Sequence, residues 1–377
     1  MRNSNRIASD VIASESRLRI GHEYTEEDVR EAVRRLARLP YLSSVEYAIE
    51  RGSDESRRVI VITVQEVRPL SFLGDGRFIF ADDTSRLDET DYDYSDPTTE
   101  WKDVALGLRW LVGGHGYAHA AMSVRRSRQS FAKNYTAWEY GYTHRDLFGT
   151  GIFATVVVQT PVDSVEERTL TPAVTVGLPL TTNQTLSIDV EDTVFVRGKL
   201  RIQGTEFRQL HAENTRSASW TYDTTDGVFV RSRGAFARVT AYRWMRDDAD
   251  FRSSRGSFEA EATHVNANGV DVAALRYWER STGQSLFAGV LAGWAKVGGD
   301  AAHRKSSYEV LKGGYSRRLG PRDARVELEA RLVFNQWGLP PASFLPHRDR
   351  SVEALASWAW KGRWGAVRVG AGYARGF

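Results

Sequence analysis

Apolar and polar side chains alternate along the last stretch of the chain, residues 365–377. One face would carry Val367, Val369, Ala371, Tyr373 and Phe377, and the other Arg368, Gly370, Gly372, Ala374 and Gly376. The same period of two recurs in residues 324–334, where apolar residues alternate with Arg and Glu. Amphipathic segments of about ten residues, separated by turns, are typical of a transmembrane β-barrel.

The alternating pattern predicts about sixteen antiparallel strands between residues 72 and 377, an even number. Residues 255–266 and 269–281 form two of these strands in this interpretation. If the N-terminal domain lies on the inner side of the membrane, the strand count places residues 338–349, with three prolines, on that same side. Short turns are expected there. Either one late strand is therefore misplaced or the number of strands is lower than sixteen.

Residues 1–69 follow a different pattern. Thr25 can cap a helix whose first turn is acidic and whose apolar positions recur at helical spacing, and Pro40 ends that helix. Two strand-like runs follow, at residues 44–49 and 59–64. These elements predict one small α+β domain ahead of the barrel.

The beginning of the chain is polar, since Met1–Asp10 lacks the apolar centre of a secretory signal. Only Met1–Arg6 precede a helix predicted to begin near Ala8. We therefore expect a trimmed chain whose first domain starts inside or just after its first strand. The barrel is expected to occupy residues 70–377.

Composition excludes several classes of protein. No run approaches the ~18 apolar residues that a membrane helix needs, and the absence of cysteine excludes a disulfide scaffold and a thiolate metal site. The 11 Trp and 15 Tyr suit the headgroup level of a bilayer. A net charge of +3, spread over alternate strand positions, argues against nucleic-acid binding and favours a polar lumen.

Candidate chemistry is sparse. No G-x-S-x-G motif is present, so we expect no enzyme and no cofactor. His115 and His119 are four residues apart but supply too few ligands for a metal, and the intervening Gly116 indicates a turn, so no metal site is expected. Arg325, Glu327, Glu329 and Arg331 are expected to form a network of paired charges in the lumen, with a selectivity ring as the alternative.

Three runs in the first domain, 18–28, 36–46 and 59–66, resemble a POTRA domain of the BamA and TamA superfamily of outer-membrane barrels. Residues 140–151 and 220–234 resemble turn motifs of that superfamily. The residues that carry the turn motifs are Asp146, Leu147, Phe148, Gly149 and Gly151, then Asp223, Asp226, Arg233 and Gly234. We expect these aspartates and glycines at tight periplasmic turns or strand ends, because Asp binds nearby amides and Gly supplies positive φ.

The resemblance implies a bacterial outer-membrane protein with its POTRA domain in the periplasm, acting in protein assembly, insertion or secretion. A client strand would pair with the POTRA sheet edge and with the seam between the first and last barrel strands. That seam would consist of Phe72, Phe78 and Phe80 facing Val367, Val369, Gly370, Gly372, Tyr373 and Phe377. Its glycines favour weak pairing of the two strands.

Partners implied by the resemblance are outer-membrane lipid and lipopolysaccharide, an unfolded or secreted client protein, and a periplasmic protein bound by the POTRA domain. The alternative is a passive pore or structural envelope barrel in which the POTRA domain only docks a partner. A third alternative is an enzyme in the barrel or in a fused upstream domain.

Overall fold

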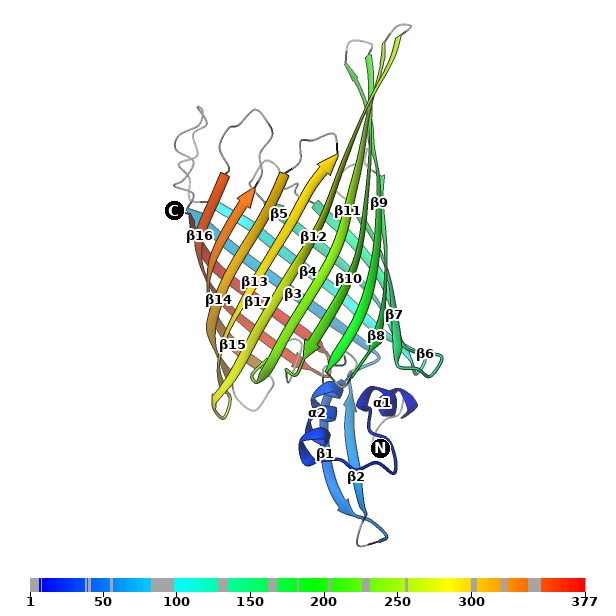
Figure 1. The fold of residues 1–377 in the computed structure, drawn as a ribbon, viewed down its shortest axis with the longest axis vertical. Helices are drawn as coiled ribbons and strands as arrows, with labels where there is room; N and C mark the ends of the chain where they lie inside the picture. Colours follow the sequence, from blue (N-terminus) through cyan, green and yellow to red (C-terminus); the bar gives the residue numbers. More distant parts are fainter. Residues whose placement is uncertain are drawn as a thin grey trace.

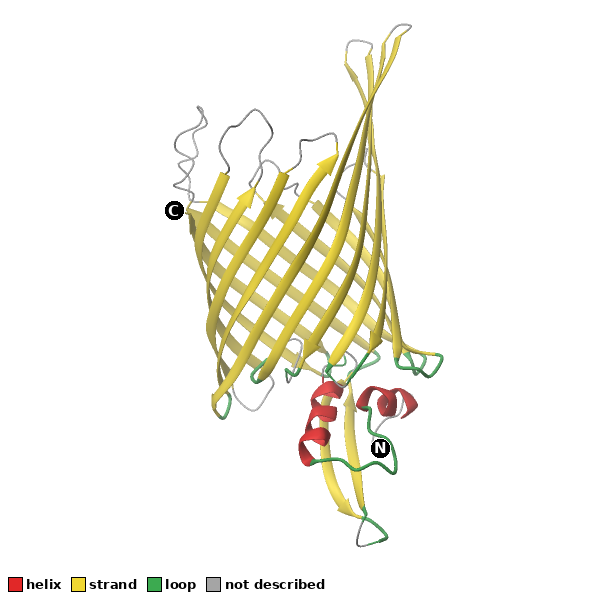
Figure 2. Cartoon of the chain, in the orientation of Figure 1, coloured by secondary structure: helices red, strands yellow, loops and turns green. Residues whose placement is uncertain are grey.

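The computed structural model places a small domain of helices and strands below one end of a tall β-barrel (Figure 1). It describes the chain except residues 1–6, 8, 38, 40–41, 55–56, 83–97, 128–134, 162–167, 182, 203–204, 226–230, 255–256, 300–303, 320–323, 338–346 and 377. Figure 2 shows that the described helices all belong to the N-terminal domain. We call the barrel end beside this domain the near end and the opposite end the far end.

The N-terminal domain packs two helices against a two-stranded antiparallel sheet. Its elements are α1 (Ser9–Ser16), α2 (Glu26–Ala37), β1 (Leu42–Arg51) and β2 (Arg58–Glu66). The fully buried side chains of its core include Val11, Ile12, Leu36, Leu42 and Val64. The helix expected after Thr25 and both expected strands are therefore present.

Thr25 starts α2 through a reciprocal cap. Its hydroxyl accepts a hydrogen bond from the Asp28 amide at 3.2 Å, and its own amide donates to the Asp28 carboxylate at 2.7 Å. Two donors that a helix start leaves without partners are satisfied in this way. The hydrogen bonds from Thr25 also lower the pKa of Asp28.

Fifteen strands close the barrel. They are β3 (Leu70–Asp82), β4 (Thr98–Val112), β5 (Gly116–Ser127), β6 (Tyr135–Leu147), β7 (Ile152–Pro161), β8 (Arg168–Pro179), β9 (Gln184–Ile202), β10 (Thr205–Asp223), β11 (Gly234–Ser254), β12 (Ser257–Ser281), β13 (Gln284–Gly299), β14 (Arg304–Leu319), β15 (Ala324–Trp337), β16 (His347–Gly362) and β17 (Gly365–Gly376). Consecutive strands pair antiparallel, whereas β17 pairs parallel with β3. The first and last strands therefore run in the same direction.

The structure has fifteen described barrel strands where the pattern predicted about sixteen, because residues 257–281 form a single strand. β12 runs without a turn through Asn266 and Gly269, which pair with β11 on one side and β13 on the other. A Cβ on Gly269 would lie 2.4 Å from the Tyr242 ring, so this glycine makes room for an aromatic side chain. With one strand fewer, Trp337 and His347, on either side of residues 338–346, pair at the far end.

Large apolar side chains lie exposed on the outside of the barrel. They include Leu106, Leu108, Trp138, Tyr140, Val156, Val174, Val176, Ile188, Val270, Leu311, Leu328, Leu332, Trp358, Val369 and Tyr373. An apolar band of this extent is unusual on a water-exposed surface and is typical of a barrel that faces lipid. None of the described helices is long and apolar enough to span a membrane.

Strands β9 to β12 are longer than the other barrel strands, at 19, 19, 21 and 25 residues. They continue beyond the far rim as a narrow twisted ribbon (Figure 1). Their pairing partners explain the shape: β8 pairs with β9 only as far as Val196, and β13 pairs with β12 only from Val265. The ribbon therefore consists of these four strands alone.

Candidate functional site: the seam and the near-end turns

The seam between β17 and β3 carries the barrel's single parallel pairing among the described strands. Its register runs from Gly365 opposite Phe72 to Arg375 opposite Asp82. Parallel ladders are slightly less stable per residue than antiparallel ones. β17 adds four glycines among its 12 residues, which contribute no side-chain packing.

The near end of the seam is held by close backbone contacts. The Phe72 amide donates to the Trp364 carbonyl and the Arg68 amide donates to the Arg363 carbonyl, both at 2.8 Å. Gly365 has φ +141°, and a Cβ there would lie 1.9 Å from the Phe72 carbonyl oxygen. Only glycine lets the two strands approach this closely.

Aromatic rings reinforce the same end. The Arg68 guanidinium lies 3.3 Å from the centre of the Trp364 ring, and the Phe72 ring stacks on Trp360 with centres 5.9 Å apart. The sequence pattern did not indicate Arg68, Trp360 and Trp364 as parts of the seam. The Arg363-Trp364-Gly365 turn was the available signal, because a tight turn before the last strand must lie next to the first strand.

The predicted seam residues lie on the two expected strands. Phe72, Phe78 and Phe80 are on β3, and Val367, Val369, Gly370, Gly372 and Tyr373 are on β17. Phe377 lies outside the described residues. Phe78 pairs with Ala371 and Val369 pairs with Gly76, so Phe78 and Val369 are not directly opposite. Weak pairing at the seam remains a prediction.

The first turn motif lies at the near end, between β6 and β7. The Gly151 amide donates to Asp146 Oδ1 at 2.6 Å, which bridges the turn. Phe148, Gly149 and Gly151 all have positive φ, of 59°, 69° and 74°. Leu147 ends β6 and pairs with Ile152. The motif therefore forms a turn closed by Asp146 and Gly151 at the near end, and its periplasmic position stays a prediction.

The second motif starts at the near end of β10. The Asp223 carboxylate accepts hydrogen bonds from the amide and the hydroxyl of Thr225, at 2.8 and 2.6 Å. Gly234 begins β11 with φ +103°, next to Arg233. Asp226 lies outside the described residues. Asp223 therefore ends β10 and Gly234 begins β11.

The N-terminal domain contacts the near-end turns directly. Lys361 of β16 donates to the Ala37 carbonyl at 2.9 Å, and Asn183 donates to Glu31 at 2.9 Å. Arg35 donates to the Thr181 carbonyl at 3.2 Å. Helix α2 is therefore tied to the β8–β9 turn and to the strand that precedes the seam.

A charge network lines the barrel interior one strand away from β17. Glu329 contacts Arg331 and lies 3.9 Å from Lys312, and Arg331 reaches Glu353 at 3.4 Å. The Glu329 side chain is 8% exposed. The expected pairing of Glu329 with Arg331 is confirmed, and the network extends to β14 and β16. Arg325 donates to Ser316 at 3.0 Å.

Comparison with known proteins identifies the N-terminal domain. The POTRA family, described as "Surface antigen variable number repeat", matches residues 2–67. Among solved structures, the crystal structure of BamA from Haemophilus ducreyi lacking POTRA domains 1–3 is similar, with a TM-score of 0.45 and 12% identity, over 99% of this chain and 79% of that chain. No curated protein matches the chain in sequence. The N-terminal domain is therefore similar to a POTRA domain, and it precedes a closed β-barrel.

Proposed function

We propose that this protein inserts or translocates client polypeptides at the outer membrane, with the POTRA domain (residues 1–69) in the periplasm and the barrel (residues 70–377) in the bilayer. The observation that carries the proposal is the parallel β17–β3 seam, which joins glycine-rich strands. Opening it exposes backbone donors and acceptors along both strands. A client strand in extended conformation satisfies these groups by pairing with the free edge.

The near-end contacts set the direction of opening. The hydrogen bonds from Arg68 and Phe72 to the β16–β17 turn hold the near end of the seam. Gly370 and Gly372 lie closer to the far end of β17. The far half of the seam separates first, and the near end acts as a hinge. The client is an unfolded or secreted polypeptide. The edge of the two-stranded POTRA sheet offers a second place where the client, or a periplasmic partner, can pair.

Locking the seam tests the proposal. The natural chain has no cysteine, so Phe78→Cys with Ala371→Cys places one disulfide across paired positions. The matched control, Ala356→Cys with Ala371→Cys, shares one substitution and locks β16 to β17 inside the sheet. We expect oxidation of the seam pair, and not of the control pair, to stop insertion of an unfolded barrel client into liposomes. A reductant should restore insertion.

The charge network in the lumen favours a second candidate, a passive pore. Paired Glu329, Arg331, Lys312 and Glu353 side chains line the interior and are suited to a polar path. Planar-bilayer conductance separates the two functions. Unchanged client insertion in the locked protein, together with charge-selective conductance, would contradict the insertion proposal and support the pore.

A further inference from the structure

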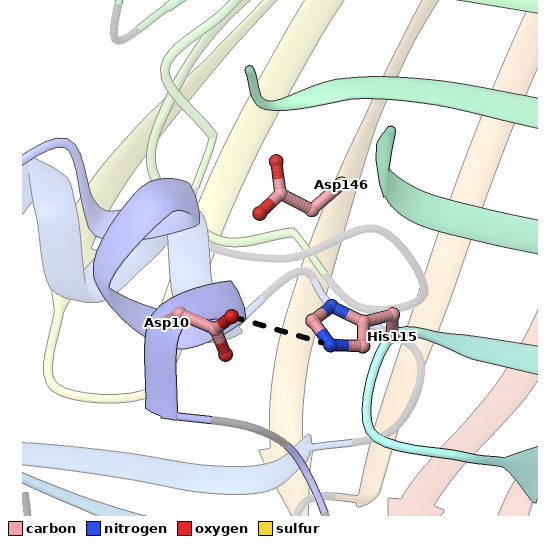
Figure 3. Close-up of side chains that lie close together, drawn as sticks. All are labelled: Asp10, His115 and Asp146. Atoms are coloured by element: carbon pink, nitrogen blue, oxygen red, sulfur yellow. Dashed lines mark ion pairs between the residues drawn. The ribbon is translucent and has the colours of Figure 1, made fainter. Parts of the chain in front are cut away.

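Three side chains from separate parts of the chain converge where the POTRA domain meets the barrel (Figure 3). Asp10 comes from helix α1, His115 from the β4–β5 turn, and Asp146 from the end of β6. One ligand atom from each lies within 4.8 Å of the other two. His115 Nε2 is 4.0 Å from Asp10 Oδ2.

The surroundings of these atoms leave room for a further partner. His115 Nδ1 is shielded from solvent and has no hydrogen-bond partner among the described residues. Asp146 is 7% exposed, and its Oδ1 accepts from the Gly151 amide. The Asp10 Oδ1 atom accepts from the Val11 amide, so the Oδ2 atom is the one that faces His115. A shielded polar atom without a partner is costly, which points to a ligand here.

We propose that Asp10, His115 and Asp146 bind a divalent metal ion of the Zn²⁺ type that joins the POTRA domain to the barrel. Imidazole nitrogen and carboxylate oxygen are both ligands of zinc, and three protein ligands leave the fourth position to water. Tetrahedral zinc places its ligand atoms about 3.4 Å apart. One ligand atom of each residue lies within 4.8 Å of the others, so the three side chains must close by about 1 Å to reach this spacing.

Neighbouring groups already orient two of the ligands. The His144 ring stacks on His115 with ring centres 5.8 Å apart and planes 4° apart, and its Nδ1 accepts from the Asp146 amide at 3.3 Å. Such outer contacts hold the ligands of metal sites in position. The nearby Arg145 lies 3.9 Å from Glu15, covers the Phe153 ring and forms a side-chain hydrogen bond with Tyr117.

The metal would fix α1 against two near-end turns. Helix α2 is already tied to the barrel through Lys361 and Asn183, whereas Asp10 and Glu15 of α1 face His115 and Arg145 of the barrel. Leu111 and Tyr117 of the barrel also pack against the apolar core of the N-terminal domain. A bound ion would add a rigid link at α1 and hold the POTRA sheet at one angle below the barrel. This proposal concerns the docking of the domain and is independent of client insertion.

Metal binding is tested on the full chain, purified in detergent and stripped with a chelator. Zn²⁺ is titrated in competition with a chromophoric chelator. We expect one ion per chain, and at least a tenfold weaker affinity for Asp10→Asn and for His115→Gln. The control is His119→Gln, which removes a histidine of β5 that binds Glu139 at 2.9 Å and should leave the affinity unchanged. Heat-modifiable migration on gels confirms that each variant is folded.

The effect of the metal on how the domain docks against the barrel is measured separately. Spin labels on Ser53→Cys in the POTRA turn and Thr282→Cys in the β12–β13 turn report the distance between domain and barrel. Zn²⁺ should narrow the distance distribution in the otherwise native chain and leave it unchanged with Asp10→Asn. The proposal is overturned if no stoichiometric binding occurs, if Asp10→Asn binds as tightly as the native chain, or if binding leaves the distribution unchanged.

Discussion

Replacing Gly365 by alanine should open the near end of the seam. Gly365 has φ +141°, and a Cβ there would lie 1.9 Å from the Phe72 carbonyl oxygen and 2.8 Å from the Phe72 amide nitrogen. Real Cβ atoms essentially never approach another atom within 3.0 Å. Strands β17 and β3 must therefore separate by about 1.1 Å at this point.

Two effects set the size of the loss. A non-glycine residue in this backbone conformation costs of order 1–3 kcal/mol. The separation also breaks the 2.8 Å hydrogen bond from the Phe72 amide to the Trp364 carbonyl, whose net value is about 1 kcal/mol. Together they predict that the free energy of unfolding falls by about 2–4 kcal/mol.

Urea unfolding in phospholipid vesicles, followed by tryptophan fluorescence, measures this change. Gly74→Ala is the matched control on the other side of the seam, because its Cβ would meet Val367 at an ordinary 3.4 Å. We expect the control to stay within about 1 kcal/mol of the native protein. A native unfolding midpoint for Gly365→Ala, or an equal loss in both variants, would show that close approach at Gly365 does not hold the seam.

Four further predictions concern the helix cap, the second turn motif and the lumen. Thr25→Ala should destabilise α2 by about 1 kcal/mol, seen as faster amide exchange by mass spectrometry. The folded-state pKa of Asp28 is lowered by its hydrogen bonds from Thr25. The contribution of Asp28 to stability should therefore be present above its ordinary pKa of ~3.9 and lost as the pH falls through the lowered value. Amide exchange in α2 that does not change over this pH range would contradict the cap. Asp223→Ala should lower stability by about 1–3 kcal/mol because the Thr225 amide loses its acceptor, whereas Asp223→Asn should retain most of it in urea unfolding. Glu329→Gln should raise anion over cation permeability in planar bilayers, because it leaves nearby cationic side chains less compensated.

The sequence by itself determined the class of fold and the nature of each element. A lipid-facing strand must alternate apolar and polar residues, so the pattern in residues 324–334 identifies the strand and both of its faces without any partner. The cap at Thr25 and the Asp-Gly turn at Asp146 could also be predicted from the sequence, because both are local. Their hydrogen bonds join residues that are at most five positions apart.

The number of strands depended on contacts between strands. Asn266 and Gly269 have the composition of a turn, yet each pairs on both sides within β12. Gly269 is needed because the Tyr242 ring of the neighbouring strand fills the space of its side chain. A single sequence does not show which of these roles a glycine has, since the deciding atom lies on another strand.

The closure of the barrel and the contact between domains were decided only by the tertiary structure. The odd number of strands makes the β17–β3 pair parallel, which sets the residues that face each other across the seam. Asp10, His115 and Asp146 are far apart in sequence and share no motif spacing. Docking of α1 against two barrel turns brings them together, and their arrangement follows from the way the POTRA domain packs on the barrel.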